Sequence, residues 1–146
     1  MTARRGLLAV AVLAYVAWVT WLAMQTGDVK GPIVSRSQVA VANVLVKAEL
    51  STQDDGRPAV KIVVVEMLIC STEGTSPKKG DEIELANLPG CRGFAGPGEY
   101  LVVLERLKDG YRLRSSPRSP GYAEGQPWVY PWSESVEKQV SFYVAG

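Results

Sequence analysis

The stretch that decides the fold is CRGFAGPGEYLVVLE, residues 91–105. A cysteine opens a glycine-rich loop, and the loop leads into an apolar run that no polar residue interrupts between Tyr100 and Leu104. Such a short apolar run is typical of a buried strand. Glycines tolerate the positive φ angles of a tight entry loop. We therefore interpret the stretch as a central strand of a small β-barrel, with Cys91 fastening the loop at the barrel's mouth.

Turn residues separate further strand patterns on both sides of this run. Asp55, Gly56 and Pro58 interrupt two apolar segments and predict a long hairpin between them. A later segment alternates polar and apolar residues, which is typical of a strand with one wet face. The five expected strands are residues 39–50, 59–70, 82–85, 100–107 and 111–114.

The last hairpin allows a prediction of register. With a three-residue loop at 108–110, Gly110 takes the left-handed position, Leu107 faces Tyr111, and Arg106 faces Arg112. A two-residue loop would instead pair Lys108 with Tyr111 and mix charged with apolar side chains on both faces. We expect the three-residue loop.

The C-terminal part combines a proline-rich segment with a helical pattern. Residues 115–132 are rich in proline, glycine and aromatic residues, which predicts an extended surface strap rather than a helix. Ser133 is a candidate N-cap, and Val136 and Val140 follow at helical spacing. The expected fold class is therefore all-β, a small five-stranded OB-like Greek-key barrel with a short C-terminal helix, preceded by one N-terminal transmembrane helix.

The transmembrane helix is expected from the N-terminal segment. Residues 7–24 contain no charge, and as a helix they would extend about 27 Å, close to the ~30 Å hydrocarbon core of a membrane. Arg4 and Arg5 precede the run, so the positive-inside bias places the N-terminus in the cytoplasm and the rest outside. Residues 1–25 are then a signal anchor, 26–38 a tether and 39–146 the barrel domain. A cleaved signal peptide is the alternative, and would make the protein secreted.

Composition excludes one class of partner. The chain has 146 residues, with 16 Lys and Arg against 15 Asp and Glu. From Ser35 onward acidic residues outnumber basic ones by one, which is the wrong sign for a protein that neutralises phosphates. We expect no nucleic-acid partner, one membrane span, and a protein partner in the envelope or outside the cell.

One short motif resembles a known family. The succession KKGDEIEL, then Cys91, then GPGEYLVVL is similar to netrin-like domains and tissue inhibitors of metalloproteinases. The resemblance covers residues 39–114 and implies an OB-fold module outside the cytoplasm. Those inhibitors begin with a cysteine whose amino group reaches the protease's zinc, and they carry several disulfides. This chain lacks that cysteine, so protease inhibition does not carry over.

The two cysteines, Cys70 and Cys91, are expected to form a disulfide. Exported chains with two cysteines usually bond them, and closing a loop of this length would stabilise the fold by about 3 kcal/mol. Two reduced, packed thiols are the alternative.

Catalysis is not expected. The chain has no histidine, which removes His-assisted nucleophiles and the usual metal-ligand sets. We predict no cofactor and no metal. Glu66 and Glu105 each interrupt an apolar strand, and either a perturbed acid or an arginine-paired carboxylate fits that position.

Two groups of residues are candidates for a binding surface. The basic stripe could attract an anionic partner, and its alternative is a solvated sheet face. The aromatic group could form a ligand platform, and its alternative is a lid on the open end of the barrel. The candidates are Arg106, Arg112, Arg114, Tyr122, Trp128, Tyr130 and Trp132.

Three functions remain from the sequence. The first is a noncatalytic, membrane-anchored extracytoplasmic interaction module. The second is a structural accessory subunit of an envelope complex that acts through its transmembrane helix. The third is a hydrolase that uses carboxylates alone, which requires Glu66, Glu84, Glu99 or Glu105 to pair across one cleft at about 5 to 9.5 Å.

Overall fold

The computed structural model describes residues 2–26, 31–71, 76–121 and 125–145. The chain divides into two compact units, Met1–Gly31 and Pro32–Gly146. The first unit contains helix α1, Thr2–Thr26, and the second contains all the other elements.

The expected transmembrane helix is contradicted. Within the described residues, no helix is both long enough and apolar enough to cross a membrane.

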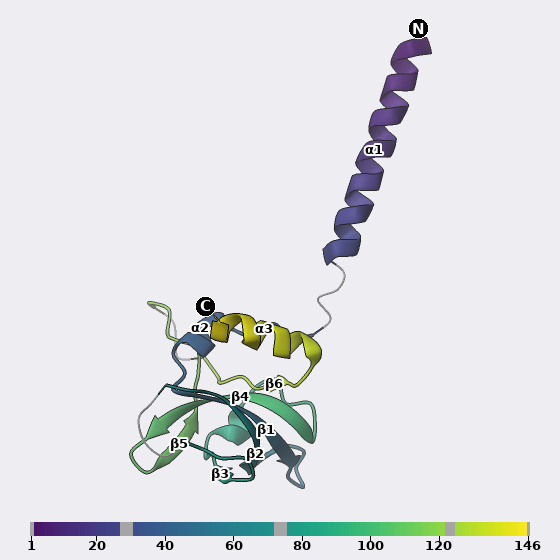
Figure 1. Ribbon diagram of the computed structural model, residues 1–146. Helices are drawn as coiled ribbons and strands as arrows, with labels where there is room; N and C mark the ends of the chain where they lie inside the picture. The colour runs from purple at the N-terminus through teal and green to yellow at the C-terminus, as the bar shows by residue number, and fades with distance from the viewer. Residues whose placement is uncertain (1, 27–30, 72–75, 122–124, 146) are drawn as a thin grey trace. The chain divides into compact units, whose positions relative to one another are not determined.

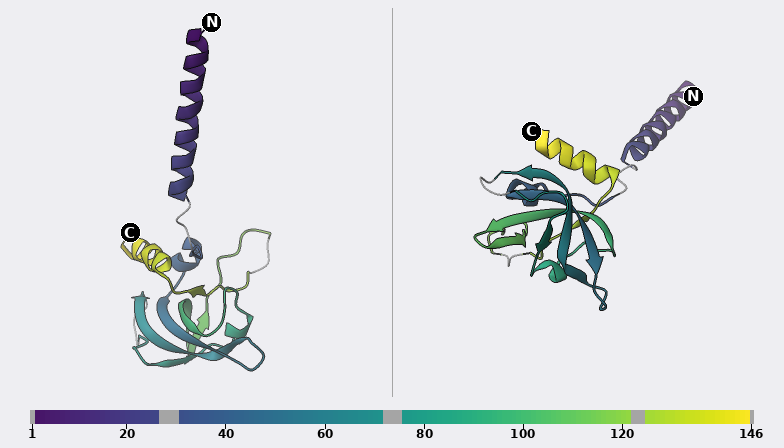
Figure 2. Two further views of the ribbon diagram at one scale, coloured as in Figure 1. Left: turned by 90° about the vertical axis from the view of Figure 1, so that its right-hand side faces the viewer. Right: turned by 60° about the horizontal axis from the view of Figure 1, so that its bottom comes forward.

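The second unit is built on an antiparallel sheet of six strands (Figure 1). Five strands follow the order β3-β2-β1-β4-β5, and β6 pairs with the first half of β4. The sheet is strongly curved (Figure 2), and its end strands β3 and β5 approach each other, an arrangement compatible with a barrel. The strands are β1 Val44–Thr52, β2 Pro58–Cys70, β3 Glu82–Glu84, β4 Gly98–Leu107, β5 Gly110–Leu113 and β6 Tyr130–Pro131.

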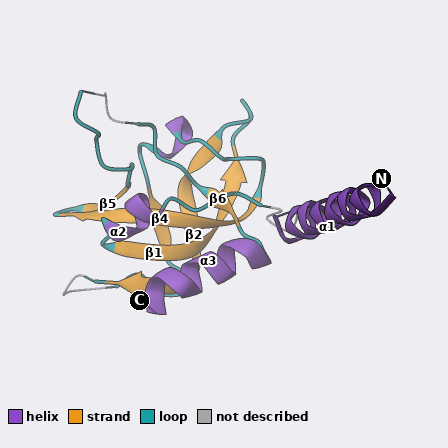
Figure 3. Ribbon diagram, turned by 90° about the horizontal axis from the view of Figure 1, so that it is seen from above, coloured by secondary structure: helices purple, strands orange, loops and turns teal. Residues whose placement is uncertain are grey.

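The described residues form three α-helices and a short 3₁₀ turn besides the strands, so the expected all-β class is wrong and the fold is mixed α and β. Besides α1, they are α2 Arg36–Ala40, η1 Leu88–Gly90 and α3 Glu134–Ala145. Helices α2 and α3 lie on the same side of the sheet in Figure 1, and Figure 3 shows them from that side. The all-β prediction missed α2, which forms where a tether and the start of a strand were expected. The prediction also missed β6, which lies inside the segment expected to be a proline-rich strap.

The decisive apolar run lies in β4, and both of its faces are buried. Tyr100, Val102 and Leu104 point into one cluster, whereas Leu101 and Val103 point into another. All five are at most 3% exposed. A strand covered on both faces has no solvent-facing positions, which explains why no polar residue interrupts the apolar run of this segment.

Two clusters therefore share the sheet. The inner cluster fills the concave side with buried side chains from β1 to β5, together with Leu85, Leu88 and Val129. The outer cluster joins Leu45 of β1 and the outer residues of β4 to the helical layer. Its buried members are Val34, Val39, Leu45, Leu101, Val103, Tyr130, Val136 and Val140.

The helical layer is held by capping and by long-range hydrogen bonds. Ser35 caps α2 by accepting from the Gln38 amide at 3.3 Å. Ser133 accepts from the Val136 amide at 3.3 Å, as predicted for the C-terminal helix. The side chain of Gln139 accepts from the Val34 amide at 2.9 Å, so α3 fixes the segment that leads into α2.

The glycine-rich loop before β4 is fastened by a tyrosine and not by a disulfide. The Tyr100 hydroxyl donates to the Gly96 carbonyl at 2.7 Å and accepts from the Ala95 amide at 2.9 Å. Gly93 has a φ of 85°, and a Cβ there would lie 2.1 Å from the Val129 carbonyl oxygen. This glycine is required because the strap at Val129 passes directly against the loop.

The predicted register of the last hairpin is wrong by one residue. Observed pairs are Leu107 with Gly110, Arg106 with Tyr111, and Leu104 with Leu113. This register places Leu113 opposite Leu104 in the inner cluster and leaves a two-residue tip, Lys108 and Asp109. Burial of that apolar pair decides the register, since a one-residue slip would turn Leu113 to the other face.

Truncating the outer face of β4 should destabilise the whole domain. Leu101→Ala removes a fully buried side chain and should lower the free energy of unfolding by about 2 to 5 kcal/mol. Urea denaturation measures the change. Leu107→Ala on the same strand, at a position 45% exposed, is the control and should cost less than about 1 kcal/mol. Equal effects of the two variants would show that the outer face is not packed.

Candidate functional site

A cleft lies between the two end strands of the sheet, β3 and β5. It has a volume of about 500 Å³ and separates β3 from the hairpin of β4 and β5. A cleft forms here because the strand order ends at β3 on one side and β5 on the other. Its lining residues are Ser76, Pro77, Asp81, Glu82, Ile83, Glu84, Arg106, Leu107, Lys108, Asp109, Gly110 and Tyr111.

The two walls of the cleft differ in charge. The β3 wall carries Asp81, Glu82 and Glu84, whereas the hairpin wall carries Arg106, Lys108 and Asp109, with one more basic than acidic group. The Asp81 carboxylate is already used within its own turn, because it accepts from the Lys78 amide at 2.7 Å. Glu82 approaches Lys61 of β2 at 3.8 Å, and both of these side chains are more than half exposed. The β3 wall therefore presents an acidic surface to solvent.

The cleft also reaches apolar groups. Ile83 is 7% exposed and belongs to the inner cluster, and half-buried Tyr111 packs against the same cluster. Leu107, which is 45% exposed, lies at the other wall. The cleft therefore combines a mostly polar, charged lining with a few apolar groups, and it can hold a segment whose side chains alternate in polarity.

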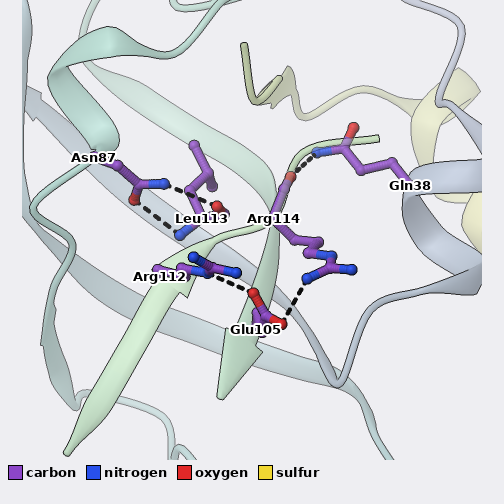
Figure 4. Close-up of polar contacts among 6 residues, drawn as sticks. All are labelled: Gln38, Asn87, Glu105, Arg112, Leu113 and Arg114. Atoms are coloured by element: carbon purple, nitrogen blue, oxygen red, sulfur yellow. Dashed lines mark hydrogen bonds and ion pairs between the residues drawn. The ribbon is translucent and has the colours of Figure 1, made fainter. Parts of the chain in front are cut away.

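At the other end of β5, a side chain takes the place of a neighbouring strand. The Asn87 amide group donates to the Leu113 carbonyl at 2.9 Å, and its oxygen accepts from the Leu113 amide at 3.0 Å (Figure 4). Both backbone groups that Leu113 directs away from β4 are thus satisfied. Covering an open edge in this way prevents unwanted strand pairing.

Beside it, Glu105 of β4 pairs with two arginines (Figure 4). Its carboxylate oxygens lie 2.5 Å from Arg112 Nε and 2.5 Å from Arg114 Nη1. The hydrogen bond from Arg112, reinforced by Arg114, holds the pKa of Glu105 below its ordinary value of 4.5. Glu105 is therefore an arginine-paired carboxylate, one of the two alternatives that the sequence left open.

A buried polar network connects α2 to the strap and to the end of β5. Gln38 is fully buried, and its amide donates to the carbonyls of Arg114 at 2.7 Å and Trp128 at 3.2 Å. Tyr130 donates to the Gln38 oxygen at 2.8 Å and accepts from the Ser35 amide at 3.1 Å. Burial raises the pKa of the Tyr130 phenol, so it remains a donor at neutral pH.

The structure separates the predicted binding residues instead of gathering them. Among the basic candidates, Arg106 lines the cleft, whereas Arg112 and Arg114 bind Glu105. These three arginines do not form one stripe.

Two of the aromatic candidates, Tyr130 and Trp132, share the outer cluster, and Trp128 is not among its members. Tyr130 is buried, Trp128 is 43% exposed, and Trp132 is half-buried against the outer cluster. Lys47 stacks over the Trp132 ring at 5.0 Å. Tyr122 lies outside the described residues.

The expected disulfide is not present. Cys70 and Cys91 form no disulfide, and both are half-buried and pack against the inner cluster. Cys70 Sγ accepts from the Ser76 hydroxyl at 3.3 Å. Burial raises the pKa of the Cys91 thiol to about 11, so this cysteine remains protonated and weakly nucleophilic at neutral pH.

The candidate catalytic carboxylates do not converge. Glu99 and Glu105 lie at opposite ends of β4, roughly 20 Å apart at 3.3 Å per residue, and Glu99 pairs with Lys47 at 2.8 Å. Glu66 is exposed on β2, and Glu84 lies at the cleft. Among the described residues, no three acidic or cysteine side chains are grouped so as to hold a metal ion.

Sequence reasoning missed the two residues that organise this region, Gln38 and Asn87. For Gln38 a signal existed, because Ser35 and Gln38 have the Ser-x-x-Gln spacing of a capping box and mark the start of a helix. For Asn87 no sequence signal existed, since its partner Leu113 is 26 residues away.

Comparison with known proteins adds no relative. No family model, curated protein or solved structure matches the chain. The resemblance to netrin-like domains stays a prediction.

Replacing the Asn87 amide should expose its role at the β5 edge. Asn87→Asp turns the donor to Leu113 into a second acceptor, which should lower the free energy of unfolding by about 1 to 3 kcal/mol. Asn43→Asp is the control, because Asn43 bonds Leu104 and Ser71 through its backbone, and we expect a change below about 0.5 kcal/mol. A wild-type denaturation midpoint for Asn87→Asp would contradict the assignment.

The ion pairs of Glu105 should make stability depend on pH. Because its folded pKa lies below 4.5, its contribution is complete above that value and is lost as pH falls through the folded pKa. Glu105→Gln should thus destabilise the protein most at neutral pH, and the difference from wild type should shrink toward about pH 3. Urea titrations at several pH values test this. A difference that grows on acidification would mean that the carboxylate is not stabilised by its arginines.

Proposed function

We propose that the domain of residues 32–146 is a noncatalytic interaction module that binds a protein partner at the cleft between β3 and the β4–β5 hairpin. The observation that carries the proposal is the cleft itself, about 500 Å³ with charged walls and a few apolar groups, Ile83, Leu107 and Tyr111, between them. This volume falls within the range of roughly 300 to 1,000 Å³ that ligand sites occupy.

The state of the charged groups favours binding over catalysis. Glu99 and Glu105 are each neutralised by cations, and their separation of roughly 20 Å along β4 exceeds the ~5 to 9.5 Å that paired glycosidase carboxylates need. The raised pKa of Cys91 also argues against a thiol nucleophile. The cleft presents acidic and basic side chains, which are groups that can recognise a partner.

We propose in addition that the domain acts outside the cytoplasm. Arg4 and Arg5 followed by a long uncharged apolar run are the features of an export signal. Cleavage after α1 would release the domain as a secreted protein, and N-terminal sequencing of the mature chain would identify the new terminus.

Site-specific photocrosslinking tests the interaction directly. A benzophenone amino acid at Leu107, an exposed position of the cleft, should produce a discrete crosslinked species in cells that make the protein. The same group at Glu137, exposed on α3 and absent from the cleft lining, is the control and should not yield that species. Crosslinks that are identical from both positions, or absent from Leu107, would contradict a partner at the cleft.

A further inference from the structure

The backbone of β3 has one edge that no described strand covers. The Leu85 amide donates to the Val60 carbonyl at 2.7 Å, and the Val64 amide donates to the Asp81 carbonyl at 2.9 Å. Bonded residues alternate along an antiparallel strand, so Ile83 also faces β2 and the backbones of Glu82 and Glu84 face away. Among the described residues, β3 pairs with β2 alone.

The far end of the β5 edge, outside the cleft, differs from β3. There Asn87 satisfies both outward groups of Leu113, as a neighbouring strand would. A side-chain amide thus covers the Leu113 end of β5, whereas among the described residues no strand pairs with the outward amides and carbonyls of Glu82 and Glu84. An uncovered edge of this kind is a template for another strand.

The side chains of β3 specify what that strand should carry. Ile83 points to the inner cluster, and the side chains of Glu82 and Glu84 are exposed on the other face. A residue opposite either glutamate would place its side chain beside a carboxylate, which favours a basic residue. The intervening residues would point toward Ile83 and Tyr111, which favours apolar side chains.

We propose that the cleft binds an extended segment of a partner protein, alternately basic and apolar, that pairs with β3 as an added antiparallel strand. The inference rests on the proposed interaction function and specifies its ligand. Main-chain hydrogen bonds to Glu82 and Glu84 give the affinity, and the acidic β3 wall gives the selection for basic side chains.

Fluorescence anisotropy with a labelled hexapeptide that alternates lysine and valine tests the proposal on the full chain. We expect saturable binding, and no binding of a hexapeptide that alternates glutamate and valine. Because the lysine backbones would face β3, N-methylation of the lysine nitrogens should weaken binding about tenfold or more, whereas N-methylation of the valine nitrogens should leave it unchanged.

Variants of β3 provide a second test of the proposal in the same peptide-binding experiment. Glu84→Pro removes one outward amide and leaves the ladder to β2 intact, so peptide binding should weaken about tenfold while the protein remains folded. The double variant Glu82→Lys with Glu84→Lys should abolish binding of the lysine peptide. Glu137→Lys, the same charge change on α3, is the matched control and should bind like wild type.

Two results would overturn the proposal. One is the absence of saturable binding of the lysine and valine peptide, and the other is equal binding of the peptide with methylated lysine nitrogens. If a crosslinked partner is still captured from Leu107 while these results hold, the interaction function stands and strand addition to β3 is wrong. If the Leu107 crosslink is lost as well, both the interaction function and strand addition to β3 are wrong.

Discussion

Burial of β4 on both faces is the constraint on which the rest of the domain depends. Its even residues from Tyr100 to Leu104 fill the concave side of the sheet, and Leu101 and Val103 fill the other side. A strand of this kind cannot be at the surface, so it requires β1 beside it and a helical layer above it. Helices α2 and α3 meet that requirement, and Gln139 and Tyr143 of α3 bond the Val34 backbone to hold the layer closed.

The same arrangement determines where the cleft forms. With β4 and β1 in the centre, the strand order must end at β3 and β5, and these are the strands that border the cleft. The outer face is already occupied by helices, and the buried Gln38 network fixes α2 against the strap and the end of β5. In the part of the chain that the structure describes, the cleft brings the edge backbone of β3 and charged side chains together at the solvent.

Local patterns predicted the parts of the structure that local chemistry controls. The β1–β2 hairpin, the β4–β5 hairpin and the helix that Ser133 caps were expected from turn residues, branched residues and helical spacing. Features set by distant contacts were not. The hairpin register follows from burial of Leu113 opposite Leu104, and the glycine loop is shaped by Tyr100 and Val129. The expected disulfide and the expected membrane span rested on compartment and run length, and the described residues contain neither a disulfide nor a helix that could span a membrane.

Amide hydrogen exchange tests the central claim most directly. If β4 is covered on both faces, the amides of Leu101 to Leu104 should be among the slowest of the chain and should exchange only through global unfolding, with an opening free energy equal to that from denaturant. The outward amides of Glu82 and Glu84 should exchange rapidly in the same experiment. Exchange of the β4 amides through a local opening well below the global free energy would contradict the account.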